Sequence, residues 1–334
     1  AQVNEIIRQL NPLRDIANDQ LTRQVDVAAK DSTEKLNLSL ALLAADPRQS
    51  EYLLGQLPRV TPEQFVVVRD ALQPEAADVE GLWDVVDDDQ QTPAYRFQAA
   101  AALAAFAAED SRWPSIAPFV VGYLTEEVPS LYFVSWLEAI RPASKALEEP
   151  LIEILRDSER LRSEQRQRSA VALAEYLDDR PEDLVSVLLL AKDYSEYAPL
   201  LQSLQVHRQT VVELLNGTIG SPADDDLSES DREAFVDRQA LAAVTLLQLE
   251  TADLVWPLLR HSRDPSLRSS IIQHARKFRT NPETFFERLA DETDVTVRRA
   301  LVQILGGTYR ASMVASLREE IADSLQRLYR TDED

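Results

Sequence analysis

Side chains that commonly carry out acid–base, nucleophilic or metal chemistry are scarce in this sequence. It contains no cysteine and three histidines, His207, His261 and His274, among 334 residues. Without cysteine the chain can form no disulfide, thiolate zinc site or cysteine nucleophile. His261 and His274 have no Ser, Cys or second His at a matching spacing, and carboxylates are too abundant for any pair to indicate catalysis. We therefore expect no catalytic residue, no metal site and no cofactor.

Acidic runs are a second kind of feature that could do chemistry, because carboxylates bind Ca²⁺. Residues 87–89 and 224–226 are each three aspartates. If the second run opens an EF-hand loop, Glu229 stands where glycine is required and Phe235 where glutamate is required. The motif fails, so we interpret both runs as solvated loops, with a long acidic loop expected at 220–231.

Glycine, which nucleotide-binding loops and nucleophile elbows require, is also rare. The chain has 7 glycines, well below the usual share of about 7%. None of them belongs to G-x-G-x-x-G, G-x-x-x-x-G-K-[ST] or G-x-S-x-G. Nucleotide sites and hydrolase elbows of these kinds are therefore excluded.

The densest basic cluster could bind an acidic partner, because arginine pairs with carboxylate or phosphate through two parallel hydrogen bonds. The candidate partner-binding residues are Arg160, Arg162, Arg166 and Arg168. The alternative is a charged loop in which Asp157, Glu159 and Glu164 balance the arginines. Of the two interpretations, we favour the charged loop.

The elements that must position these residues are helices. Apolar residues recur at i, i+3, i+4 and i+7, which places one apolar stripe on each helix. One such run is Val297, Ala300, Leu301, Ile304 and Leu305. Thr61-Pro62 and Asn281-Pro282 supply a cap and a first-turn proline. Residues 65–68, 119–121 and 131–134 resemble strands in composition, but they fit the helical rhythm and we interpret them as helical.

The helical pattern repeats along the chain. Residues 96–104 resemble residues 166–174, and residues 264–268 resemble residues 294–298. The first helices of successive pairs are expected near Ser50, Val79, Pro114, Leu147, Pro181, Arg208, Thr251 and Asn281, about 33 residues apart. We expect an all-α fold: a right-handed, HEAT-like α-α superhelix of about nine helix pairs, running as one array through 1–334.

Arginines and aspartates recur at the turns of this pattern. They are Arg96, Arg166, Arg268 and Arg298, with Asp264 and Asp294. One interpretation is a basic stripe that binds a carboxylate or phosphate. The other, which we favour, is a structural ladder in which the arginines bridge neighbouring repeats to turn aspartates, as in HEAT-type arrays.

Net charge limits the partners. The formal charge of −22 argues against nucleic acid, because phosphate neutralisation needs a surplus of Lys and Arg. The longest apolar run, 99–108, is too short for a membrane helix, which needs about 20 residues, so we expect no direct membrane insertion. The chain begins at Ala1 and holds one methionine, so we expect a piece of a longer protein.

Several segments together point to a narrower family. They are 39–43 (SLALL), 46–47 (DP), 68–72 (VRDAL), 136–142 (WLEAIRP), 255–262 (VWPLLRHS) and 297–301 (VRRAL). Across almost the whole chain, this set resembles the helical region of large planctomycete serine/threonine protein kinases. There it lies between a kinase domain with a membrane segment and a domain resembling formylglycine-generating enzymes. The kinase signatures have no match here, so no catalytic residue is carried over.

From the repeats and the resemblance we expect a non-catalytic scaffold, the connector or regulatory region of a membrane-anchored bacterial kinase. Its partner would be another protein or the flanking domains of the same chain. The alternative is a ligand-sensing or catalytic domain with a pocket between repeats.

Overall fold

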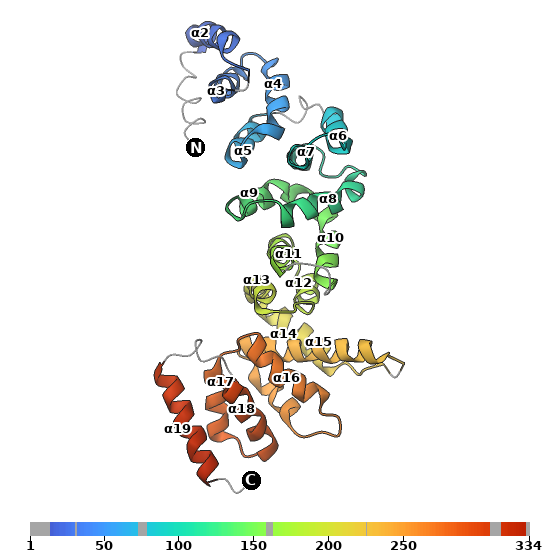
Figure 1. The fold of residues 1–334 in the computed structure, drawn as a ribbon, viewed down its shortest axis with the longest axis vertical. Coiled ribbons are helices and arrows are strands. Elements are labelled where there is room, and N and C mark those ends of the chain that lie inside the picture. The colour runs from blue at the N-terminus through green and yellow to red at the C-terminus, as the bar shows by residue number, and fades with distance from the viewer. Residues whose placement is uncertain are drawn as a thin grey trace. The chain divides into compact units, whose positions relative to one another are not determined.

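In a computed structural model of the chain, every described segment of regular structure is a helix (Figure 1). The described residues are 14–30, 32–72, 79–157, 163–224, 226–307 and 315–331. The expected all-α class is confirmed. The three strand-like stretches lie in helices α5 (Pro62–Ala71), α8 (Trp113–Glu126) and α9 (Ser130–Ile140).

The chain divides into two compact units, Ala1–Leu151 and Ile152–Asp334. The expectation of a single array of nine helix pairs through 1–334 stays a prediction. Besides α5, α8 and α9, the described helices up to the boundary are α2 (Arg14–Val27), α3 (Thr33–Leu42), α4 (Gln49–Gln56), η2 (Leu57–Arg59), α6 (Val79–Asp87), α7 (Pro93–Phe106), η4 (Arg141–Ala143) and α10 (Ser144–Arg156).

The core of the first unit is built around α7. Residues 99–104 of this helix are fully buried, and five of the six are alanine. Small side chains let α7 lie close to α6, α9 and η2, which pack against it. Aromatic rings fill the remaining space, with the Trp136 ring 5.0 Å from that of Phe65 and 5.4 Å from that of Phe97.

The second unit continues with α11 (Ser163–Tyr176), α12 (Pro181–Leu188), α13 (Tyr194–Leu204), η5 (Gln205–His207), α14 (Arg208–Gly220), α15 (Glu229–Gln248), η6 (Ala252–Leu254), η7 (Trp256–Leu259), α16 (Ser266–Lys277), α17 (Pro282–Asp291), α18 (Val295–Gly307) and α19 (Ala315–Thr331). Its core joins α13, α15 and α16. The buried Tyr197 hydroxyl donates to Thr245 Oγ1 at 3.2 Å, and the Tyr197 ring lies 5.0 Å from that of Phe278.

Two features of the second unit differ from expectation. The acidic loop expected at 220–231 is shorter, because α14 extends through Gly220 and Ser228 caps α15, accepting from the Asp231 N–H at 3.1 Å. The helix expected near Thr251 is a pair of short 3₁₀ helices. Pro257 has no N–H for an α-helical bond, and the Leu258 N–H bonds the Val255 carbonyl instead.

The end of α15 has an unusual backbone. Glu250 has a φ of 56°, in the left-handed region that normally favours glycine. The Thr251 N–H bonds the Leu246 carbonyl at 3.0 Å and the Glu250 N–H bonds the Leu247 carbonyl at 3.2 Å, the pattern of a Schellman motif. The Glu250 side chain is 85% exposed and lies 3.6 Å from Arg208, so its ion pair contributes little.

Glu250→Gly should therefore stabilise the chain by about 1 kcal/mol, because glycine adopts this conformation without the cost that a side chain incurs. Urea unfolding measures the change. Glu250→Ala is the matched control: it removes the same carboxylate but keeps the Cβ, so it should give no gain. Equal effects of the two variants would contradict the argument.

Candidate functional site

The predicted basic cluster is only partly described. Arg160 and Arg162 lie outside the described residues. Arg168, on α11, donates to Glu164 Oε1 at 2.8 Å and is 11% exposed. Arg166 is buried with its acid partner: Nε and Nη2 lie 2.6 Å and 2.9 Å from the Glu196 carboxylate. For Arg166, the structure replaces the expected partner-binding role with an internal one.

The remaining contacts of Arg166 explain that role. Its Nη1 donates to the carbonyls of Ile154, Leu155 and Asp157, at the end of α10, at 2.9–3.1 Å. Glu196, in the first turn of α13, also accepts from the Lys192 N–H at 2.7 Å. One guanidinium thus joins the end of α10 to the start of α13.

Arg96 and Arg268 occupy equivalent positions early in α7 and α16. Arg96 Nε donates to the Val86 carbonyl at the end of α6, at 2.7 Å. Arg268 Nε donates to the Leu259 carbonyl at the end of η7, at 2.9 Å, and its Nη2 reaches the Thr296 carbonyl in α18 at 3.0 Å. We call this shared contact the arginine clasp. In it, an arginine near the start of one helix donates hydrogen bonds to the last backbone carbonyls of the preceding helix.

The aspartates expected to complete the ladder have a different role. Asp264 accepts from the Ser266 N–H at 2.9 Å, and Asp294 accepts from the Thr296 N–H at 2.8 Å. Hydrogen bonds from these neighbours' side chains and N–H groups lower the pKa of both carboxyl groups.

The expected Arg–Asp pairing is therefore corrected. Arg268 bonds carbonyls, Arg96 pairs with Asp89 in its own turn, and Asp294 lies 3.6 Å from Arg260. The predicted ladder residue Arg298 lies early in α18, where its N–H bonds the Asp294 carbonyl at 2.9 Å.

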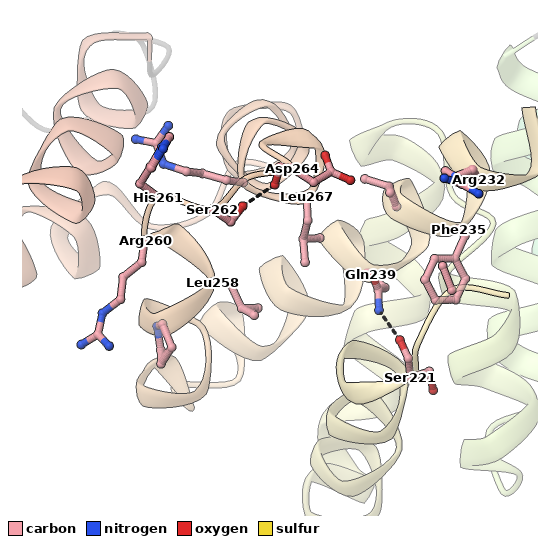
Figure 2. Close-up of a pocket in the computed structure, with 14 residues that line it drawn as sticks. Ser221, Arg232, Phe235, Gln239, Leu258, Arg260, His261, Ser262, Asp264 and Leu267 are labelled. Atoms are coloured by element: carbon pink, nitrogen blue, oxygen red, sulfur yellow. Dashed lines mark hydrogen bonds between the residues drawn. The ribbon is translucent and has the colours of Figure 1, made fainter. Parts of the chain in front are cut away.

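A groove of about 420 Å³ opens in the second unit between α15 and the segment that leads into α16 (Figure 2). Its ends are basic, with Arg232 beside Phe235 at one end and Arg260 beside His261 at the other (Figure 2). Leu258 and Leu267 lie between them, together with the polar side chains of Gln239, Ser262 and Asp264 (Figure 2). The combination suits a ligand that has both charge and apolar surface.

Hydrogen bonds fix the walls of this groove. Gln239, buried on α15, donates to the carbonyls of Thr218, Ile219 and Ser221 at 2.9–3.3 Å and so holds the end of α14 against α15. On the opposite wall, the clasp of Arg268 ties α16 to η7. Hydrogen bonds within the chain therefore hold both walls of the groove.

Sequence reasoning missed this groove, although a signal was present. Between Leu254 and Pro282 the chain has one acidic residue, Asp264. The same stretch has six basic ones: Arg260, Arg263, Arg268, Arg276, Lys277 and Arg279. In a chain of net charge −22, that basic segment indicates a surface with a different partner preference from the rest.

A Ser–Asp–His group lies nearby on α15 and α16, but it is not arranged for nucleophilic catalysis. The Ser270 hydroxyl lies 3.3 Å from His274 Nδ1 but donates to Asp237 at 2.7 Å, whereas a catalytic serine would donate to the histidine. His274 Nδ1 lies 2.9 Å from the Ser270 carbonyl, and Nε2 lies 3.9 Å from Asp237. Burial lowers the pKa of His274, against the opposing effect of Asp237.

Comparisons with known proteins give no family. No protein-family model matches the chain, and no curated protein matches it significantly. Among the described residues, no group of three or more His, Asp or Glu side chains is placed to hold a metal ion. Within the same residues, no helix is long and apolar enough to cross a membrane.

Arg166→Met should destabilise the chain by about 3–5 kcal/mol, because it leaves Glu196 buried without its partner. Urea unfolding measures the loss. The double variant Arg166→Met/Glu196→Leu removes both charges and should be more stable than Arg166→Met alone. A double variant as unstable as the sum of its single variants would contradict this account.

His274 should make stability depend on pH. The pKa of His274 is lowered from its ordinary value of 6.5 in the folded chain. The unfolded chain therefore takes up the proton first, and the free energy of unfolding should fall as the pH drops below about 6.5. Thermal melts between pH 7.5 and 5.5 test this. His274→Gln should weaken the dependence, while His261→Gln, an exposed control, should leave it intact.

Proposed function

We propose that this chain is a non-catalytic scaffold and protein-interaction module, built as a right-handed HEAT-like α-solenoid through 1–334. The arginine clasp is the observation that carries the proposal. It recurs at Arg96, Arg166 and Arg268, and the last two also contact the start of a helix about 30 residues further on. Contacts of this kind between successive helix pairs are what stacked repeats require.

The mechanism of such a module is an extended surface of rigid hairpins. Side chains on one face of the stacked helices recognise a protein partner, or hold flanking domains at a set spacing. The resemblance of the sequence to the helical region of planctomycete kinases supports the second use, as a connector in a multidomain serine/threonine kinase. The net charge of −22 favours basic partners over most of the surface.

A ligand-sensing domain is the second candidate function, favoured by the groove beside α15. A thermal-shift screen against nucleotides, metal ions and small anions separates the two. A specific rise in melting temperature supports the sensor, because a ligand that binds only the folded state stabilises it.

The scaffold proposal is tested by a binding isotherm of the chain against the domains that flank it in its parent protein. We expect saturable binding in the micromolar range or tighter, weakened as salt rises because the acidic surface contributes. Binding that is insensitive to salt would count against the electrostatic part of the mechanism. Binding to neither domain would overturn the connector role and direct the search to outside partners.

A further inference from the structure

We propose that the groove between α15 and α16 binds an acidic protein segment that carries an apolar side chain. Arg232 and Arg260 would pair with carboxylates at the two ends, and the apolar side chains of the groove would cover the apolar side chain of the segment. The inference rests on the proposed function as an interaction module, and it names the class of partner for one surface.

Charge complementarity identifies the occupant. Three arginines line the groove, Arg232, Arg260 and Arg268, against one carboxylate, Asp264. Asp264 accepts a hydrogen bond from Ser266 and keeps its negative charge, and the positive charge of Arg232 helps to lower the pKa of its carboxyl group. One wall of the groove belongs to the basic segment between Leu254 and Pro282. The other wall comes from the acidic stretch 221–239, but none of the described carboxylates of that stretch lines the groove. The lining, with three arginines and one carboxylate, therefore favours a carboxylate over a cation.

The apolar side chains of the groove distinguish a protein segment from a bare anion. Phe235, Val236, Leu258 and Leu267 are all half-buried, and the groove is open to solvent beside them. Residues 229–234, the preceding turns of α15, are exposed, so the helix itself leaves Phe235 uncovered. Inorganic phosphate or a free nucleotide would leave this apolar surface in water, whereas a Leu or Phe side chain would cover it.

The basic ends are placed to bind without large rearrangement. Arg260 is 66% exposed, and its Nε lies 3.6 Å from Asp294, longer than a hydrogen bond. Arg268 is held by two carbonyls and keeps its positive charge at the groove wall. Because Gln239 and Arg268 fix the two walls, little conformational entropy is lost when the segment binds.

The test is fluorescence anisotropy of the full chain with a labelled peptide, Glu-Asp-Leu-Phe-Asp-Glu. Two matched peptides replace either its acids by lysine or its Leu-Phe by Ser-Ser. We expect saturable binding of the first peptide, and at least tenfold weaker binding of each of the others. Equal binding of the Ser-Ser peptide would reduce the groove to an anion site and overturn the inference. Equal or tighter binding of the lysine peptide would overturn it as well.

Charge-matched variants locate the site. Arg232→Glu/Arg260→Glu should weaken binding of the acidic peptide at least tenfold. Arg238→Glu/Arg263→Glu makes the same change in net charge on the same helix and loop, outside the groove, and should change the affinity less than twofold. Phe235→Ala should weaken binding without altering charge. Circular dichroism and thermal melts confirm that each variant is folded.

Equal losses in the two arginine pairs would show a general charge effect and overturn the inference, as would no saturation below millimolar peptide. Neither result bears on the flanking-domain isotherm, which uses the unaltered chain and does not require the groove. Failure of this inference is therefore distinguishable from failure of the proposed scaffold.

Discussion

The rest of this structure depends on one constraint: the last backbone carbonyls of each helix need hydrogen-bond donors from outside that helix. A helix that stops so that the next can pack against it leaves its last carbonyls without partners in the same helix. Burying them unpaired is costly. In this chain an arginine from the following helix supplies the missing donors, as Arg166 does for the end of α10. The same side chain then reaches α13 through Glu196, so one residue fixes two junctions.

Apolar packing and the arginine clasp contribute in different ways. The alanines at 99–104 bring α7 close to its neighbours, and the burial of leucines and aromatic rings around them supplies most of the stabilising free energy. Apolar contact alone tolerates sliding and rotation of one helix on another. The clasp restricts that freedom, because the five hydrogen bonds that Arg166 donates hold the end of α10 and the start of α13 to α11.

Much of the helical framework was predictable, because its signals are local. Proline, cap residues and the apolar period marked helix starts at positions such as 79, 181 and 208, where α6, α12 and α14 begin. The arginines at the turns were also found. Their acceptors were not, because most are backbone carbonyls, which every residue has and no sequence pattern distinguishes.

The groove illustrates the other limit of sequence reasoning. Its lining comes from residues 221–239 and 257–268, which become neighbours only when α15 packs on α16. The 3₁₀ geometry of η7 also decides where Leu258 points, and the helical period at this position indicated an α-helix instead. Composition marked the segment as basic, but composition does not show that an apolar surface lies beside the charges.

A basic groove on a chain of net charge −22 also has a kinetic consequence. An acidic segment that approaches from solution must cross a repulsive field before it meets the arginines, so its association is slow. Salt at about 0.1 M screens charges more than about 10 Å apart. It therefore reduces the long-range repulsion of the approaching segment more than it weakens the short contacts with the arginines. A segment tethered nearby avoids this barrier, since its effective concentration reaches the millimolar range. With the acidic partner we propose, the groove would favour segments that belong to the same assembly over those that diffuse freely.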